Sequence, residues 1–283
     1  MFYILISILL FSFNNVLWKK NLKNTAVYFL ISYRSFITSF LSIGAMLFIV
    51  KDYSINFESF LRVSAGSFLG VVGLLTMLVV IKKTSLQWLG IYNLVGIFIT
   101  LFYLYFFENL QSFPPITGIT FIILGYALFI FFNQKSKVHL TFKYHLLLII
   151  MICSFNFSYV IHWKNLTQEI HPLLIISNQE VLVFMCSSFL LFLREKKSIT
   201  RINYKNHFNG ILLMSIVILF AVLFSFLGIQ ATDPLITAIL FLVSPLTTIL
   251  FSYIFFKEQI ILKHIISISI ISVGVFIIHY HSL

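Results

Sequence analysis

Long apolar runs follow one another along almost the whole chain, and short polar connectors separate them. A transmembrane helix needs about 20 predominantly apolar residues, and ten of the runs approach or exceed that length. They cover residues 2–18, 26–50, 60–81, 85–107, 115–132, 144–161, 172–193, 208–229, 235–256 and 264–280. Because the strands of a membrane barrel are shorter and alternate in polarity, the pattern predicts an all-α polytopic membrane protein with ten transmembrane helices.

The composition agrees with a chain that folds in lipid. Hydrophobic residues make up 60% of the 283 positions and charged residues 10%, and the mean hydropathy is +1.04; soluble domains carry about 25% charged residues. Both cysteines, Cys153 and Cys186, lie inside apolar runs. The sequence has no phosphate-binding loop, zinc-binding helix motif or nucleophile elbow, so we expect no enzyme, no cofactor, no metal and no direct use of ATP.

The net charge of +11 reflects membrane topology. Fifteen of the nineteen lysines and arginines lie in the connectors 1–2, 3–4, 5–6, 7–8 and 9–10, and three (Lys51, Arg62 and Lys164) lie on the other side. Since cytoplasmic loops carry the excess of basic residues, this count places both termini outside. The basic residues are scattered over short connectors, so we expect no nucleic-acid partner.

The two halves of the chain share an ordered set of short matches. Ser-Phe-Asn occurs in the first span and again in the sixth, Phe-Phe ends the fourth and ninth spans just before an acidic residue, and a late glycine marks the fifth and tenth. The matching positions are 12–14 and 154–156, Glu108 and Glu258, and Gly125 and Gly274. Each half holds five spans, an odd number, so the second half enters the membrane with opposite orientation. We predict two inverted five-helix repeats, residues 1–133 and 134–283.

The order of these matches resembles a known family. Ser244-Pro245, Phe255-Phe256-Lys257-Glu258 and Gly274 resemble the end of an EamA repeat of the drug/metabolite transporter superfamily, and Phe11 to Asn14 followed by Lys19 is similar to its start. Phe11-Ser12 replaces the usual Trp-Gly, and Val95 stands where the second repeat has Pro245. The resemblance implies an exporter with both termini in the cytoplasm, opposite to the charge count.

Two charges lie deep inside spans. Arg34 and Glu180 are each eight residues into equivalent spans, the second and the seventh, which is about 12 Å from the span end. A charge near the bilayer centre costs about 2.5–3.5 kcal/mol on insertion scales, so it needs a partner or an aqueous cavity. One interpretation is that Arg34 binds an anionic or zwitterionic substrate, or that Glu180 carries a coupling proton. The other is that the two groups are buried, neutralised and structural.

Polar and aromatic residues complete the candidate substrate site. Asn14 and Asn156 recur at equivalent positions, and Asn93 begins a polar stripe on the fourth span; packing between helices is the alternative role. Trp88 and Tyr92 lie in the first two turns of the fourth span, where they suit substrate stacking or an interfacial aromatic belt.

Two further residues have a predicted local role. Pro245 removes a backbone N–H from the ninth span and favours a kink or a gate there. His162 follows the predicted end of the sixth span directly, so we expect a solvated histidine at the membrane boundary.

We therefore expect a secondary transporter in the inner membrane, an exporter of small organic metabolites such as amino acids or drug-like compounds. It would work by alternating access with a central site between the repeats. Its partners would be a small-molecule substrate and the lipid bilayer, with a proton as the candidate coupling ion, and it would be a monomer or a homodimer. The alternatives are a membrane-embedded enzyme acting on lipid or prenyl substrates and a non-transporting receptor.

Overall fold

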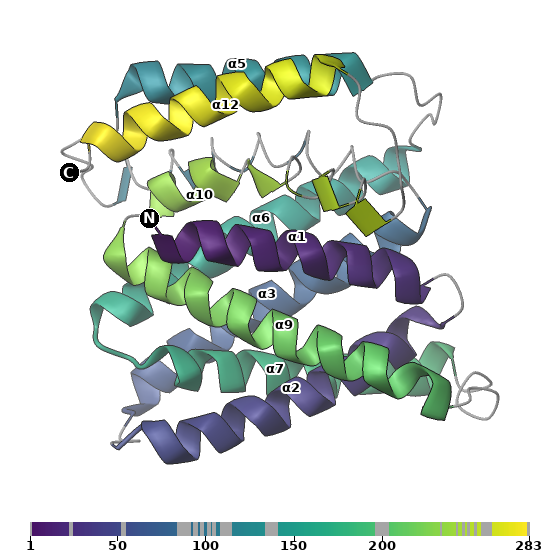
Figure 1. Ribbon diagram of the computed structural model, residues 1–283. Helices are drawn as coiled ribbons and strands as arrows, with labels where there is room; N and C mark the ends of the chain where they lie inside the picture. Colours follow the sequence, from purple (N-terminus) through teal and green to yellow (C-terminus); the bar gives the residue numbers. More distant parts are fainter. Residues whose placement is uncertain are drawn as a thin grey trace.

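The fold is described from a computed structural model of the chain. The structure describes residues 2–22, 25–51, 55–83, 115–133, 141–195, 204–232, 234–241 and 262–281, together with single positions within 92–107 and 243–255. This part of the chain is helical and contains no strand. Its helices are α1 (Phe2–Leu22), α2 (Val27–Ile49), α3 (Phe57–Lys83), α5 (Ile116–Asn133), α6 (Phe142–Thr167), α7 (Pro172–Arg194), α9 (Tyr204–Ala231), α10 (Pro234–Phe241) and α12 (Leu262–His281) (Figure 1).

Within the described residues, six helices are long and apolar enough to cross a membrane by length and composition: α1, α2, α3, α6, α7 and α9. Helices α5 and α12 contain shorter apolar segments, Ile116–Leu128 and Ile265–Gly274. The prediction of an all-α, multi-pass membrane protein is confirmed. For the fourth and ninth predicted spans the structure describes α10 and helical single positions, so the count of ten transmembrane helices stays a prediction.

Several helices run past the apolar segments that predict them. Helix α6 ends at Thr167 where the hydropathy pattern ends at residue 161, and α9 begins at Tyr204 where the pattern begins at 208. Polar residues continue a helix beyond the hydrocarbon because the backbone hydrogen bonds are satisfied internally at any depth. Hydropathy therefore marks the lipid-immersed length of each helix and misses its polar ends.

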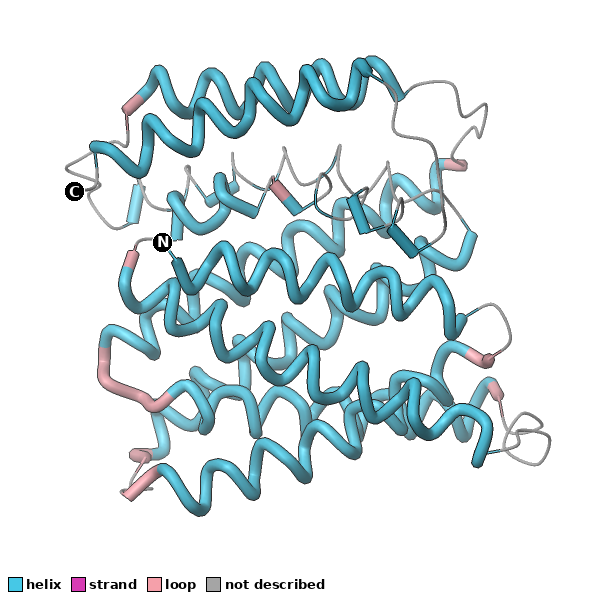
Figure 2. Tube along the Cα trace, viewed as in Figure 1, coloured by secondary structure: helices cyan, strands magenta, loops and turns pink. Residues whose placement is uncertain are grey.

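The helices pack as antiparallel pairs that join the two halves of the chain. The pairs are α1 with α9, α2 with α7, α3 with α6, and α5 with α12. Figures 1 and 2 show them as stacked layers, with the α5–α12 pair at one edge of the stack and the α2–α7 pair at the other. We call the face where α1, α3 and α7 begin and α2, α6 and α9 end the N-terminal face. Both chain termini lie at this face (Figure 1).

Glycines set the closest helix approach in the α5–α12 pair. A Cβ at Gly125 would lie 2.7 Å from Ile271 Cγ1, and one at Gly274 would lie 2.7 Å from the Gly118 carbonyl oxygen and 2.9 Å from the Ile122 backbone nitrogen. Small residues let membrane helices approach closely. The late glycine of each half is therefore the residue that admits the partner helix.

Large apolar side chains on the outside of the stack are exposed. Phe48 is 93% exposed, Phe40 73% and Phe276 67%. A soluble fold would leave far fewer phenylalanines in water, whereas lipid tails solvate them. This surface is consistent with the helix hydropathy and indicates a lipid-facing exterior.

Candidate functional site

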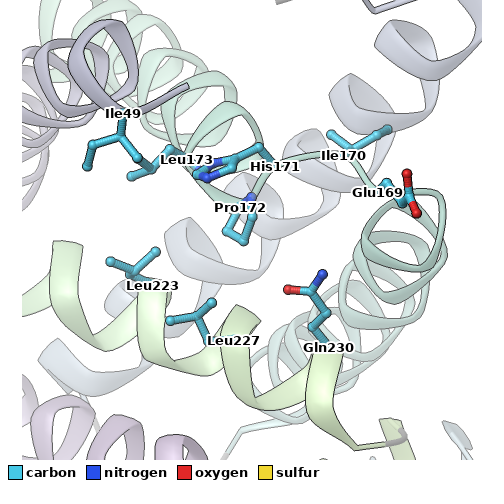
Figure 3. Close-up of a pocket in the computed structure, with 9 residues that line it drawn as sticks. All are labelled: Ile49, Glu169, Ile170, His171, Pro172, Leu173, Leu223, Leu227 and Gln230. Carbon is cyan, nitrogen blue, oxygen red and sulfur yellow. The ribbon is translucent and has the colours of Figure 1, made fainter. Parts of the chain in front are cut away.

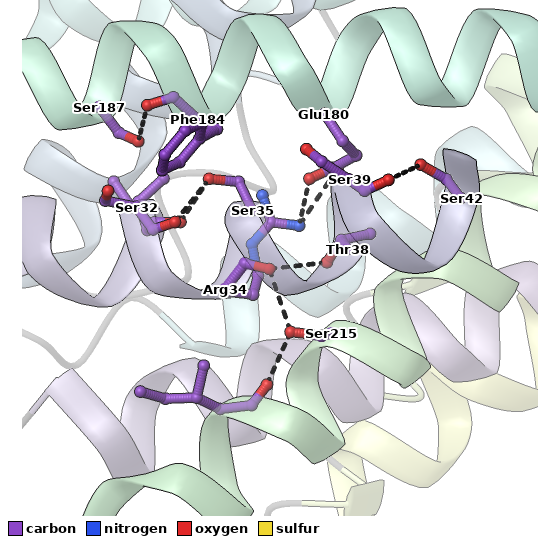
Figure 4. A network of polar contacts seen from close by, with 12 residues as sticks. Ser32, Arg34, Ser35, Thr38, Ser39, Ser42, Glu180, Phe184, Ser187 and Ser215 are labelled. Carbon is purple, nitrogen blue, oxygen red and sulfur yellow. Dashed lines mark hydrogen bonds and ion pairs between the residues drawn. The ribbon is translucent and has the colours of Figure 1, made fainter. Parts of the chain in front are cut away.

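The two deep charges form a buried ion pair between α2 and α7 (Figure 4). Arg34 Nη1 lies 3.2 Å from Glu180 Oε1 and 3.2 Å from Oε2, and the two side chains are 2% and 5% exposed. Arg34 Nε and Nη2 and Glu180 Oε2 are buried without a hydrogen-bond partner. The charges thus neutralise each other while part of their hydrogen-bonding capacity is unused.

Hydroxyl groups surround this pair. Thr38 Oγ1 donates to the Arg34 carbonyl oxygen at 2.9 Å, and Ser215 Oγ of α9 donates to the same oxygen at 3.1 Å (Figure 4). Ser35 Oγ donates to the Ile31 carbonyl, while Ser39 Oγ is buried without a partner. These polar residues therefore make a buried face of α2 that is turned to α7 and α9.

Two further contacts tie the α2–α7 pair together toward the opposite face. Glu195, which follows α7, accepts hydrogen bonds from the backbone N–H groups of Tyr28 and Phe29 at 3.0 and 3.2 Å. A carboxylate at a helix N-terminus satisfies free N–H groups and complements the helix dipole. Ser32 Oγ and Ser188 Oγ lie 2.6 Å apart. The ion pair thus lies within a firmly tied helix pair.

Asn156 and Ser12 lie in two separate polar clusters. Asn156 Oδ1 accepts from Thr100 Oγ1 at 2.7 Å, and Gly96 packs against the same amide. In the other cluster, Ser12 Oγ donates to the Ser244 carbonyl at 3.0 Å and contacts the Thr247 hydroxyl. Each cluster joins the first helix of one half to the fourth predicted span of the other half.

Asn14 is 3% exposed, and its Oδ1 has no hydrogen-bond partner. A buried carbonyl oxygen of this kind costs about 1–3 kcal/mol if it stays unpaired. Asn14 therefore keeps an unused acceptor inside the protein, as a binding group would.

Tyr92, the predicted stacking residue of the fourth span, bonds to α6. Its hydroxyl lies 2.6 Å from His145 Nδ1, and the two rings are 6.1 Å apart. His145 belongs to the first turn of α6, so this contact lies at the face opposite the N-terminal face.

An aromatic row that the sequence did not single out lies toward the N-terminal face. The Phe241 ring is 5.8 Å from the Phe11 ring and 5.8 Å from the Tyr159 ring, and the Tyr159 hydroxyl lies 3.2 Å from Ser225 Oγ. In a chain with 34 phenylalanines no local pattern predicts that Phe11 and Phe241 meet. Only the packing of α1, α6, α9 and α10 brings these rings together.

The expectation of a solvated His162 is wrong. This side chain is 1% exposed and packs against Gly66 of α3 and the Phe226 ring, 5.4 Å away. Because α6 continues to Thr167, His162 lies inside the helix and not at its end. Asn165, one turn further along α6, accepts a 2.8 Å hydrogen bond from Arg62 Nε of α3 near the end of α6.

Two cavities flank the loop between α6 and α7 at the N-terminal face. One of about 370 Å³ is lined by Leu223, Leu227 and Gln230 of α9, by Glu169 to His171 of the loop, and by Pro172 and Leu173 at the start of α7 (Figure 3). The other, about 290 Å³, is lined by polar groups including Asn56, Ser59 and Gln168. The residues that line them do not include those predicted for the substrate site.

Several predicted residues lie outside the described residues: Trp88, Asn93, Glu108, Pro245 and Glu258. Of the predicted site, the structure brings Arg34 to Glu180 and places Asn156 beside the fourth span. It buries Asn14 in α1 and joins Tyr92 to His145.

Comparisons with known proteins agree with the helix arrangement. Residues 142–280 match the model of the EamA-like transporter family. A solved structure described only as "Crystal structure of protein" matches with a TM-score of 0.78 at 14% identity, covering 98% of this chain and 94% of that one; at this identity the likeness concerns the fold alone. No curated protein matches the sequence. The family match thus covers the second half of the chain, which carries the closing motif that resembles the end of an EamA repeat.

Proposed function

We propose that this protein is a secondary transporter of the inner membrane that exports small organic metabolites by alternating access. Ten transmembrane helices would form two inverted five-helix repeats, with the substrate site between them. The family match of residues 142–280 supports transport in general, and the exporter direction follows from the resemblance to the family. The observation that carries the proposal is the reciprocal pairing of helices between the two halves.

This pairing is reciprocal. The first helix of the first half pairs with the third of the second half (α1 with α9), and the third of the first half pairs with the first of the second (α3 with α6). The second helices pair with each other (α2 with α7), and so do the fifth (α5 with α12). A two-fold relation between two units requires contacts of this reciprocal kind. The pattern supports two repeats of one fold.

Single residues support the same relation. Gly125 packs on Ile271, and Gly274 packs on Ile122; positions 125 and 274 are 149 residues apart, as are 122 and 271. The two contacts are therefore equivalents of each other. Arg34 and Glu180 occupy related depths of the second and seventh spans and bond to each other, as groups on a two-fold axis do.

The proposed substrate site lies where the two halves meet. We assign to it Asn14, with its unused acceptor, Asn156, which contacts the fourth span, and Tyr92 of that span. Arg34 and Glu180 contribute a balanced pair of charges. Trp88 and Asn93 remain predictions for the same site. Inverted-repeat transporters bind their substrates near the bilayer midplane at the repeat interface.

A ligand screen on the purified protein tests the proposal. A panel of amino acids, other small metabolites and drug-like compounds is added, and thermal unfolding is followed. A ligand that binds only the folded state raises the apparent stability by about 2.7 kcal/mol at 100 times its Kd. We expect one chemical class to raise the unfolding temperature, and Asn14→Ala and Asn156→Ala to reduce the shift.

Mass spectrometry of the same mixtures separates transport from catalysis. A transporter returns each ligand chemically unchanged. Conversion of a lipid or prenyl compound would favour the enzyme alternative and contradict the proposal, as would the absence of any stabilising small molecule across the panel. A proton as coupling ion is tested by repeating the screen at acidic and neutral pH.

A further inference from the structure

The aromatic row at Phe241 occupies a particular place in the helix arrangement. Phe241 is the last residue of α10, which begins at the N-terminal face directly after α9. Its ring lies between Phe11 of α1 and Tyr159 of α6, 5.8 Å from each. These are the first helices of the two halves, so one side chain from the ninth predicted span bridges both halves.

A hydrogen bond joins this row to a fourth helix. The Tyr159 hydroxyl lies 3.2 Å from Ser225 Oγ of α9, and α10 contacts α1, α6 and α9. Ring pairs at this separation contribute more than their buried area alone. Together, Phe11, Phe241 and Tyr159 (the aromatic barrier) join four helices at one level.

Polar groups lie directly behind the aromatic barrier. Ser244 and Thr247 follow Phe241 in the chain, and both contact Ser12 of α1. Because α10 starts at the N-terminal face, Phe241 lies between that face and this polar cluster. The three rings therefore lie on the N-terminal side of this polar cluster.

The opposite face carries a related contact. Positions 92 and 241 are 149 residues apart, the separation that also relates Gly125 to Gly274. Because Val95 stands where the second half has Pro245, Tyr92 lies one residue from the position equivalent to Phe241. It bonds to His145 of α6 at 2.6 Å, so an aromatic side chain lies near this position in each half.

We propose that Phe241 closes the transport path at the N-terminal face by filling the space between Phe11 and Tyr159, and that the structure is the state closed at this face. Opening requires the Phe241 ring to leave one or both neighbours. This inference rests on the proposed transport function, but its test needs no substrate. A negative result in the ligand screen is thus distinguishable from a negative result in the test of the aromatic barrier.

Cysteine accessibility tests the barrier. The two native cysteines are replaced by serine, and Ser12→Cys places a thiol just behind Phe241. A membrane-impermeant maleimide is applied to vesicles of each orientation, with Lys51→Cys marking the N-terminal face and Lys20→Cys the opposite one. When Phe241→Ala is added, we expect the labelling rate of the cysteine at position 12 from the N-terminal face to rise about tenfold, the order expected for the loss of two aromatic pairs. The labelling rate from the opposite face should not rise.

Three variants make the result decisive. Phe276→Ala removes the same side chain from an exposed position of α12 and should change nothing. Tyr92→Ala should leave labelling from the N-terminal face unchanged. Phe241→Leu retains apolar volume and should give a smaller rise if the alanine variant does not fold. Labelling of both Phe241 variants at the rate of Phe276→Ala, or an equal rise from both faces, would overturn the proposal.

Discussion

At the residue scale, the Arg34–Glu180 pair combines a desolvation cost with mutual attraction. Both side chains are buried, and three of their polar atoms have no hydrogen-bond partner. Removing one member of a buried pair leaves an unpaired charge, whereas replacing both with apolar groups is often tolerated. The ion pair therefore holds α2 and α7 in register. The attraction between the two charges offsets their desolvation cost, which a single buried charge could not offset.

Substitutions at this pair should be strongly non-additive. Arg34→Met alone should destabilise the protein by about 3–5 kcal/mol because Glu180 is left unpaired, and the double variant Arg34→Met, Glu180→Met should recover most of that loss. Unfolding in detergent, followed for all four members of the cycle, measures this coupling. Arg194→Met, at the exposed end of α7, is the control and should have little effect. Additive effects would show that the two charges do not support each other.

His171 gives the N-terminal face a dependence on pH. Its Nδ1 accepts the Leu173 N–H at 3.2 Å and caps α7, and burial lowers the pKa of His171 below its ordinary 6.5. Folding therefore favours the neutral ring, which can accept this bond. The cap's contribution is present above the unfolded pKa and is lost as pH falls below it.

We expect the cap to lose its contribution of about 1 kcal/mol on acidification from about pH 7.5 to pH 5. His171→Asn supplies a capping side chain that does not titrate, so it should remove this part of the pH dependence. Thermal unfolding of both proteins at the two pH values is the measurement. An equal loss of stability in both proteins would show that His171 does not act as the titrating cap.

At the element scale, the α5–α12 pair depends on glycines. A Cβ at Gly274 meets backbone atoms of Gly118 and Ile122, and a backbone cannot move aside as a flexible side chain can. Gly44 of α2 differs, since a Cβ there meets nothing within 4 Å. The two positions offer a matched comparison of the same substitution.

Gly274→Ala should destabilise the protein by about 1–3 kcal/mol through overpacking. Gly44→Ala should stabilise it by about 0.4–1 kcal/mol, because alanine loses less conformational entropy in a helix. Unfolding temperatures measured in one detergent compare the two. If Gly274→Ala were as stable as Gly44→Ala, the close approach of α5 and α12 would be wrong.

At the scale of the whole molecule, the sequence predicts what depends on local composition. Apolar runs locate the helices, and the depth of Arg34 and Glu180 within equivalent spans identifies two groups that need partners. Helix ends are less predictable: α6 extends through polar residues, so His162 lies in the core and not at the boundary. Contacts between distant residues, such as Phe11 with Phe241, depend on how four helices pack, and no local pattern contains them.

The reciprocal pairing of helices is the main support for the proposed inverted repeats, and the proposed function adds that one central site is exposed to each side in turn. Solute counterflow in proteoliposomes tests this claim most directly. Vesicles loaded with an unlabelled stabilising ligand from the screen are diluted into the labelled ligand. We predict transient accumulation of label inside the vesicles that hold the protein, and none in empty vesicles or in those loaded with a non-binding compound. Label that enters protein-containing and empty vesicles alike, for ligands that bind the purified protein, would contradict the account.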